Sequence, residues 1–216
     1  MMTDYRITSI EPQKRNLKRR NIFLNEAYAF GLDEEVVLKY HLHEGDTVSE
    51  ETVQTVLLEE ERVRAKQKAL SLLAYRARSK AEIRERLSQR GYDQNVTDSV
   101  VSDLERVGLL NDPAFASAYV QTRMVQKPMG KRLLIRELLG KGVTESLAVR
   151  AVEDRYSSVT ELEVALSLIK PRLGRYRREK PDAVRRRIGD FLKRRGFDWD
   201  VIGEVMDWVR GELGQD

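Results

Sequence analysis

The chain has 216 residues, of which 41% are hydrophobic, and this length allows one or two domains with a sizeable core. Its 39 Lys and Arg and 35 Asp and Glu leave a net charge of +4, which by itself is only a weak sign of an anionic partner. The lack of cysteine excludes disulfides, thiolate zinc sites and cysteine nucleophiles. We find neither an apolar run long enough to span a membrane nor a signal-peptide core, and we therefore expect a cytoplasmic protein.

Residues 1–48 differ in pattern from the rest of the chain. The apolar runs Ile22–Leu24 and Ala27–Leu32 are separated by two residues, which is typical of a β-hairpin. Tyr5–Ile10 is a candidate for a further strand, and Asp33 is suited to cap a short helix. This segment is predicted to form a small α+β appendage.

The chain after this appendage has the pattern of successive helices. Ser49 is placed to begin a long helix, and Ser79–Glu82 has the spacing of a capping box. Asp112 precedes a proline, which predicts an N-cap at Asp112. Pro128 and Pro171 mark helix ends or kinks, because the residue before a proline avoids the helical region.

A ten-residue pattern occurs three times, at Leu87–Val96, Leu138–Leu147 and Leu192–Val201. Each copy has Leu first, a cation in fourth place, then glycine, an apolar residue and a residue that favours an N-cap. We interpret the glycine as the left-handed residue that ends one helix shortly before the next begins. The three glycines are Gly91, Gly142 and Gly196.

The repeat predicts a mainly α protein with three tandem three-helix units. We place them at residues 49–110, 111–157 and 158–216, after the hairpin-containing appendage of residues 1–48. Each unit buries little surface alone, so we expect the units to stack into an elongated, curved array.

Charge is distributed unevenly within the repeats. The three helices before the glycines hold 14 basic and 5 acidic residues, and the three helices after them hold 4 basic and 12 acidic residues. Phosphates repel acidic helices, so this pattern argues against a helix-turn-helix that inserts its second helix into the major groove of DNA. Cations at helix ends and anions at helix starts also complement the helix dipoles, which explains part of the pattern without a partner.

The segment from Lys170 to Arg195 holds 12 basic and 3 acidic residues, more than helix capping requires. We interpret it as a contact with a phosphate backbone or an acidic protein groove, while a solvated charged face is the alternative. The candidate binding residues are Lys131, Arg132, Arg172, Arg175, Arg177, Arg178, Arg185, Arg186, Arg187, Lys193, Arg194 and Arg195.

Enzymatic signatures are lacking in the sequence. It has no phosphate-binding glycine loop, no nucleophile elbow and no zinc-protease motif, so we expect neither catalysis nor a cofactor or metal. Phe115, Tyr119, Trp199 and Trp208 occur at spacings that favour a place in the core over base stacking.

A set of residues spread over the three repeats forms a family-like pattern: Ala69, Leu73, Arg76, Arg78-Ser79, Glu82-Ile83, Leu87, Gly91, Leu104, Gly108-Leu109, Asp112, Phe115-Ala116, Ala118, Arg123, Gly130, Arg132, Glu137-Leu138, Lys141-Gly142, Leu192 and Arg194-Arg195-Gly196-Phe197. With these residues the stretch 69–216 resembles the RecX family of recombinase regulators, and the N-terminal appendage is similar to that of longer members. Val184 departs from the small or capping residue found at Ser79 and Gly130, so the start of the helix before Gly196 is less defined.

The resemblance implies a non-enzymatic regulator that binds the RecA filament on single-stranded DNA, in DNA recombination, DNA repair and the SOS response. Members of this family typically restrain filament growth, strand exchange and ATP hydrolysis, and some bind DNA themselves. We expect this protein to be a monomer and to inhibit the recombinase. A general DNA-binding module and a protein scaffold stay open as alternatives.

Overall fold

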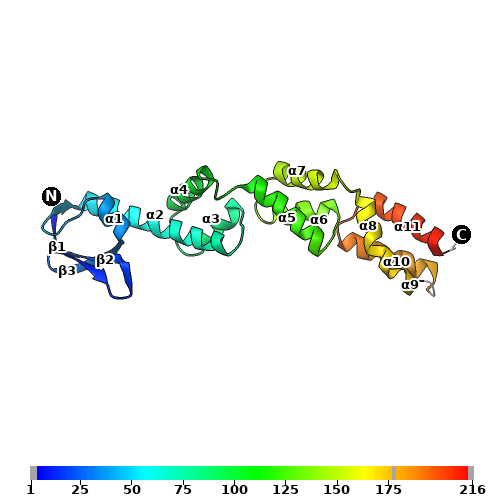
Figure 1. Cartoon of the computed structure of the whole chain (residues 1–216), viewed down its shortest axis with the longest axis horizontal. Helices are drawn as coiled ribbons and strands as arrows, with labels where there is room; N and C mark the ends of the chain where they lie inside the picture. The colour runs from blue at the N-terminus through cyan, green and yellow to red at the C-terminus, as the bar shows by residue number, and fades with distance from the viewer. Residues whose placement is uncertain (1–3, 177–178, 214–216) are drawn as a thin grey trace. The chain divides into compact units, whose positions relative to one another are not determined.

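A computed structural model describes residues 4–176 and 179–213, which form two compact units (Figure 1). The first unit contains the chain up to Ala77 together with Ile83–Leu109. The second contains Arg78–Glu82 and the chain from Leu110 onward. The start of the helix at residue 80 therefore belongs to the second unit, although its remainder belongs to the first.

The first unit begins with a four-stranded antiparallel sheet of order β3-β2-β1-β4. The strands are β1 (Asp4–Gln13), β2 (Asn16–Leu24), β3 (Ala27–Asp33) and β4 (Thr47–Ser49). The predicted hairpin of β2 and β3 is confirmed, and its turn residues Asn25 and Glu26 have positive φ angles of 50° and 68°. Such angles suit a two-residue turn whose twist matches that of the strands.

Helices α1 (Glu34–Lys39) and α2 (Glu50–Tyr75) follow the predicted caps, because Asp33 and Ser49 accept hydrogen bonds from the first turns. The buried side chains of Ile22, Val36 and Val56 belong to one core that joins the sheet to these helices. The unit is completed by most of α3 (Lys80–Ser88) and by α4 (Gln94–Arg106), which packs on α2.

The second unit contains two three-helix repeats that share one apolar core. The first of these comprises α5 (Asp112–Gln126), α6 (Lys131–Leu139) and α7 (Glu145–Tyr156). The next has three longer helices, α8 (Glu161–Ile169), α10 (Pro181–Arg194) and α11 (Trp199–Leu213), with the 3-10 turn η1 (Lys170–Arg172) and the four-residue helix α9 (Leu173–Tyr176) between α8 and α10. Leu138 and Leu192, both from the repeated pattern, are fully buried in this core.

The glycine turns have the predicted backbone. Gly91, Gly142 and Gly196 have φ angles of +82°, +72° and +80°, and in each case the next residue donates its N–H to the Leu five positions earlier. This arrangement satisfies carbonyl groups that a helix end leaves without partners. The mainly α architecture with three small helical repeats and an N-terminal sheet is thus present.

The predicted N-cap at Asp112 is wrong. Asn111 caps α5 by accepting the N–H of Ala114 at 2.8 Å, and Asp112 is the first helical residue. The buried Asp112 carboxylate instead accepts the backbone N–H of Lys80 at 2.8 Å. The sequence could not distinguish two adjacent residues that both favour caps.

Candidate functional site

The last two repeats meet where the Gly196 turn packs on the start of α6. The N–H of Gly130 donates to the carbonyl oxygen of Arg195 at 2.8 Å. A Cβ atom at Gly196 would lie 2.3 Å from the Cβ of Leu133, so only glycine allows this approach.

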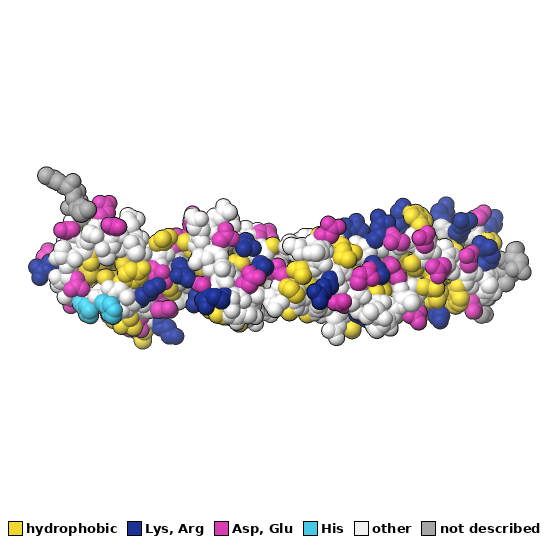
Figure 2. All heavy atoms as spheres, turned by 90° about the horizontal axis from the view of Figure 1, so that it is seen from above, with side chains coloured by type: hydrophobic (Ala, Val, Ile, Leu, Met, Phe, Trp, Pro, Cys, Tyr) yellow, Lys and Arg dark blue, Asp and Glu magenta, His cyan; other side chains and the backbone are white. Residues whose placement is uncertain are grey.

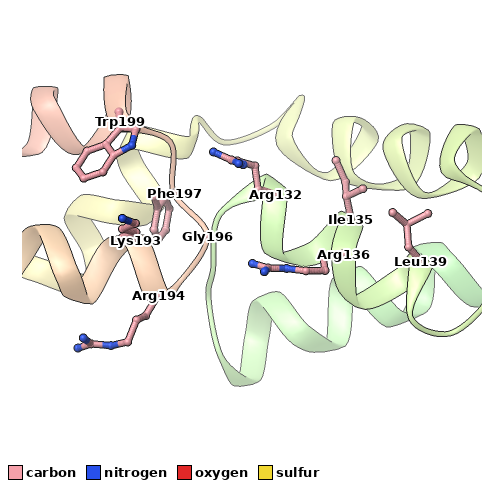
Figure 3. Close-up of a pocket in the computed structure, with 9 residues that line it drawn as sticks. All are labelled: Arg132, Ile135, Arg136, Leu139, Lys193, Arg194, Gly196, Phe197 and Trp199. Carbon is pink, nitrogen blue, oxygen red and sulfur yellow. The ribbon is translucent and has the colours of Figure 1, made fainter.

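Beside this contact lies a groove of about 820 Å³, formed by α6 on one side and the turn between α10 and α11 on the other (Figure 3). It is lined by Arg132, Ile135, Arg136, Leu139, Lys193, Arg194, Gly196, Phe197 and Trp199. Four of these nine residues are cationic and none is acidic. In Figure 3 the side chains of Arg132 and Arg136 extend from α6 toward the Gly196 turn. The groove is therefore suited to an anionic ligand.

An exposed indole stands at one end of the groove. Trp199 is 63% exposed, and the Nζ of Lys193 lies 5.0 Å from its ring centroid. The expectation that Trp199 belongs to the core is wrong, whereas Phe115 is buried as expected. A signal was present in the sequence, since the corresponding first helical residues of α4 and α7 are the polar Gln94 and Glu145.

Three of the candidate binding residues line the groove. They are Arg132, Lys193 and Arg194, and Arg132 also forms an ion pair with Asp198 at 2.8 Å. Arg136 was missed, because its place in the groove depends on packing against a turn about 60 residues later in the chain.

Two other candidates have structural partners within the second unit. The Nζ of Lys131 pairs with Glu153 at 2.7 Å and lies 5.4 Å from the ring centroid of Tyr156. Arg195 is half-buried and donates from Nη1 to the carbonyl oxygen of Pro128 at 2.8 Å. Burial, followed by the charge of Arg172, lowers the pKa of Arg195. The Lys131 side chain therefore joins α6 to α7 within one repeat, whereas the Arg195 side chain contributes to the joint between the last two repeats.

The remaining candidates lie around α9 and α10. Arg172 stacks over Phe191 at 4.5 Å, and Arg187 pairs with Glu179. Arg175, Arg185 and Arg186 are exposed, and Arg177 and Arg178 lie outside the described residues. Figure 2 shows Lys and Arg side chains gathered along the upper edge of the view toward the C-terminal end.

Polar groups that are buried or half-buried in the second unit form structural networks. Tyr119 donates to Glu137, which also binds Arg123 through two hydrogen bonds. Burial and then the hydrogen bond to Glu137 raise the pKa of Tyr119 to about 12. Tyr156 donates to the carbonyl oxygen of Met129 at 2.5 Å, and burial raises its pKa. These tyrosines hold helices together and are poor proton donors or acceptors at neutral pH.

Two classes of site receive no support in residues 4–176 and 179–213. No group of three or more His, Cys, Asp or Glu is placed to hold a metal ion there. Over the same residues, no helix combines the length and apolarity needed to cross a membrane.

Small helical repeats joined through glycine turns, with a cationic groove at one joint, place the chain in the class of helical-repeat proteins. The chain belongs to the RecX family of regulatory proteins. The model of the RecX N-terminal domain matches residues 5–49, and the models of the first, second and third three-helix domains match residues 65–104, 111–152 and 160–206.

Relatives and solved structures agree with this assignment. Regulatory protein RecX of Clostridioides difficile (strain 630) is 32% identical over 201 residues, which cover 93% of this chain and 94% of that protein. Regulatory protein RecX of Bacillus subtilis (strain 168) is 30% identical over 97% of this chain and 79% of its own length. A crystal structure of regulatory protein RecX matches with a TM-score of 0.73 and 25% identity, covering 94% of this chain and 99% of that one.

Proposed function

We propose that this protein binds the RecA filament assembled on single-stranded DNA and inhibits its ATPase, its growth and strand exchange, without catalysis of its own. Two lines of support meet here. The first is membership of a family whose relatives are named regulatory proteins, and the second is the cationic surface of the third repeat. We further propose that the protein acts as a monomer, with its repeats divided at residues 110/111 and 157/158.

The cations of α10 carry the proposal. Within the described part of the chain, neither Arg185 nor Arg186 forms an ion pair, and both are exposed. Arginine binds phosphate oxygens and carboxylates through paired hydrogen bonds, so both components of a nucleoprotein filament offer it partners. Contacts with phosphate also release counterions, which makes such binding sensitive to salt.

The test is the ATPase rate of RecA on single-stranded DNA, measured with and without this protein at substoichiometric to equimolar ratios. We expect the protein to lower the rate, and we expect Arg185→Ala/Arg186→Ala to lower it less. Arg150→Ala/Arg155→Ala is the matched control, because it removes the same charge from α7, which is the acidic helix of the preceding repeat. This control is expected to act as the unchanged protein does.

Other outcomes would contradict the proposal. An unchanged ATPase rate together with no co-sedimentation with filaments would rule out the proposed function. Salt-sensitive binding to naked DNA without any effect on the filament would instead favour a general DNA-binding module. Retrieval of a different protein partner, unaffected by the arginine substitutions, would favour a scaffold.

A further inference from the structure

We propose that the groove between α6 and the α10–α11 turn binds single-stranded nucleic acid, with a base stacked on Trp199 and phosphates held by Arg136 and Arg194. The proposal rests on the proposed function in one respect, since it assigns a place on this chain to the DNA strand of the filament. It is testable with DNA alone, without the recombinase.

The first argument is the chemistry of the groove. An exposed indole beside cations is the combination that binds single strands, because every base has a flat face to stack and every link has a phosphate. The Nζ of Lys193 lies 5.0 Å from the centroid of the Trp199 ring, and Trp199 is nevertheless 63% exposed. The half-buried Ile135 and the 44% exposed Leu139 supply apolar surface on the α6 wall of the groove.

The second argument is the availability of the cations. Arg132 is already paired with Asp198, whereas neither Arg136 nor Arg194 forms an ion pair within residues 4–176 and 179–213. These two arginines come from opposite walls of the groove. A strand that lies in the groove can therefore receive a contact from each side.

The third argument comes from the repeats themselves, which provide an internal comparison. In the register set by the glycines, the groove positions 132, 136, 193, 194 and 199 correspond to Ala81, Glu85, Leu139, Gly140 and Glu145. None of these five residues is a cation or an aromatic residue. The repeat fold thus has no structural need for four cations and an indole at these positions, and a ligand explains their presence here.

A nucleic acid fits these residues better than an acidic polypeptide. Carboxylates would pair with the arginines, but they would leave the exposed part of the Trp199 indole, beyond its contact with Lys193, uncovered. A nucleic-acid base can stack on the Trp199 indole, and such stacking is largely independent of base identity. We therefore expect binding of single strands with little sequence preference.

The chain offers its own reporter, because Trp199 and Trp208 are its only two tryptophans. Trp208→Phe leaves Trp199 as the single indole, and the fluorescence of this variant is followed during titration with oligodeoxythymidylate of roughly 15 nucleotides. We expect the oligonucleotide to quench the fluorescence of Trp199, and we expect the quenching to saturate as its concentration rises. The reciprocal variant Trp199→Phe, which keeps the half-buried Trp208, is expected to show little change.

Affinity is measured separately, by the anisotropy of a labelled oligonucleotide. Trp199→Ala is expected to weaken binding about tenfold or more, since it removes the stacking surface. Arg136→Ala/Arg194→Ala is expected to weaken binding and to reduce the slope of log K against log salt by about 1.4, the value for two lost contacts on a single strand. Arg150→Ala/Arg155→Ala removes equal charge from α7 and should leave both quantities nearly unchanged.

Several results would overturn the proposal. They are a Trp199 signal that does not respond to the oligonucleotide, an affinity unaffected by Trp199→Ala, and equal binding of an abasic strand or of polyglutamate. The last would assign the groove to an acidic polypeptide. DNA binding at Trp199 with no effect on RecA would reject the proposed function alone, whereas an effect on RecA without DNA binding at Trp199 would reject this groove alone.

Discussion

The hydroxyl of Ser79 donates a 2.5 Å hydrogen bond to the carbonyl oxygen of Lys141, the residue before the Gly142 turn. In the register of the repeats, Ser79 corresponds to Gly130 and Lys141 to Arg195, and the N–H of Gly130 donates to Arg195 in the same way. At both joints, the residue before the helix donates to the corresponding carbonyl group of the next glycine turn. Ser79 donates through its side chain, and Gly130 donates through its backbone N–H.

A second contact repeats in the same register. The N–H of Lys80 donates to the carboxylate of Asp112 at 2.8 Å, and the N–H of Lys131 donates to the carboxylate of Glu161 at 3.0 Å. Each acid is the first helical residue of the next repeat. These two contacts satisfy backbone donors that a helix start leaves free. A small residue is needed before Lys131, because a Cβ atom at Gly130 would lie 2.3 Å from the carbonyl oxygen of Gly196.

The glycine turns give a graded test of this joint. Gly196→Ala is expected to lower the free energy of unfolding by more than about 2 kcal/mol, because it combines a positive φ with a Cβ contact of 2.3 Å to Leu133. Gly91→Ala has the same backbone strain but no atom within 4 Å of its Cβ, and we expect a loss of about 1 kcal/mol. Urea unfolding measures both.

Gly203→Ala serves as the control for these substitutions. Gly203 lies within α11, has no positive φ and has no atom within 4 Å of the place its Cβ would take, so the substitution should stabilise the protein by about 0.5–1 kcal/mol. Equal losses for Gly91→Ala and Gly196→Ala would show that the close approach to Leu133 contributes nothing.

Glu161 is predicted to make stability fall as pH rises. Burial raises the pKa of its carboxyl group, so the folded state holds the proton more tightly than the unfolded chain does. The contribution of this group is therefore lost as pH increases from the unfolded value of 4.5 through the raised folded value. Glu161→Gln keeps an oxygen acceptor for the N–H of Lys131 and removes this loss.

The measurement is unfolding free energy of both proteins at pH 4 and at pH 7. The variant should gain stability relative to the unchanged protein at the higher pH. A difference that is the same at both values would mean that Glu161 ionises in the fold as easily as in the unfolded chain.

Glu137 is predicted to have the opposite effect on the pH dependence of stability, because its contribution is lost as pH falls. The hydrogen bonds from Arg123 lower the pKa of this carboxyl group, so its stabilising contribution is present above the unfolded value of 4.5 and is lost as pH falls through the folded value. Glu137→Gln should cost about 1 kcal/mol at pH 7, since the ion pair is partly exposed, and less at pH 3. The check is the unfolding free energy of both proteins between pH 7 and pH 3. A difference between them that stays constant over this range would refute the prediction.

The sequence was sufficient for features set by neighbouring residues. The hairpin around Asn25, the caps at Asp33 and Ser49 and the left-handed glycines all depend on a few consecutive side chains, and all are present. The three-residue strand β4 was not predicted, because its pairing with β1 depends on residues more than 40 positions earlier. Pairing over that distance has no local signal.

In the candidate site, too, the sequence indicated what neighbouring residues determine and missed what depends on distant residues. Runs of cations made Lys193 and Arg194 visible, but Arg136 enters the groove only through the packing of two repeats. Trp199 was assigned to the core from its spacing alone, whereas comparison with Gln94 and Glu145 at the same repeat position indicates exposure. Register between repeats therefore carries more information than hydrophobic spacing within one helix.

The ion pair between the half-buried Arg19 and the buried Glu60 offers a test within the first unit. The Nη2 of Arg19 lies 2.7 Å from Glu60 Oε1, and the N–H of Asp33 donates to Glu60 Oε2 at 2.6 Å. Glu60 is 5% exposed, so its charge depends on these partners. Because β2 carries Arg19 and α2 carries Glu60, the pair joins the sheet to the long helix.

Arg19→Ala is expected to destabilise the protein by about 3 kcal/mol, because it leaves a buried carboxylate without its cation. Adding Glu60→Gln to that variant removes the unpaired charge and keeps an acceptor for Asp33, so the double variant should be more stable than Arg19→Ala alone. Urea unfolding of the two single variants and the double variant gives the coupling between the residues. Additive losses would mean that Arg19 and Glu60 do not stabilise each other across the contact between β2 and α2.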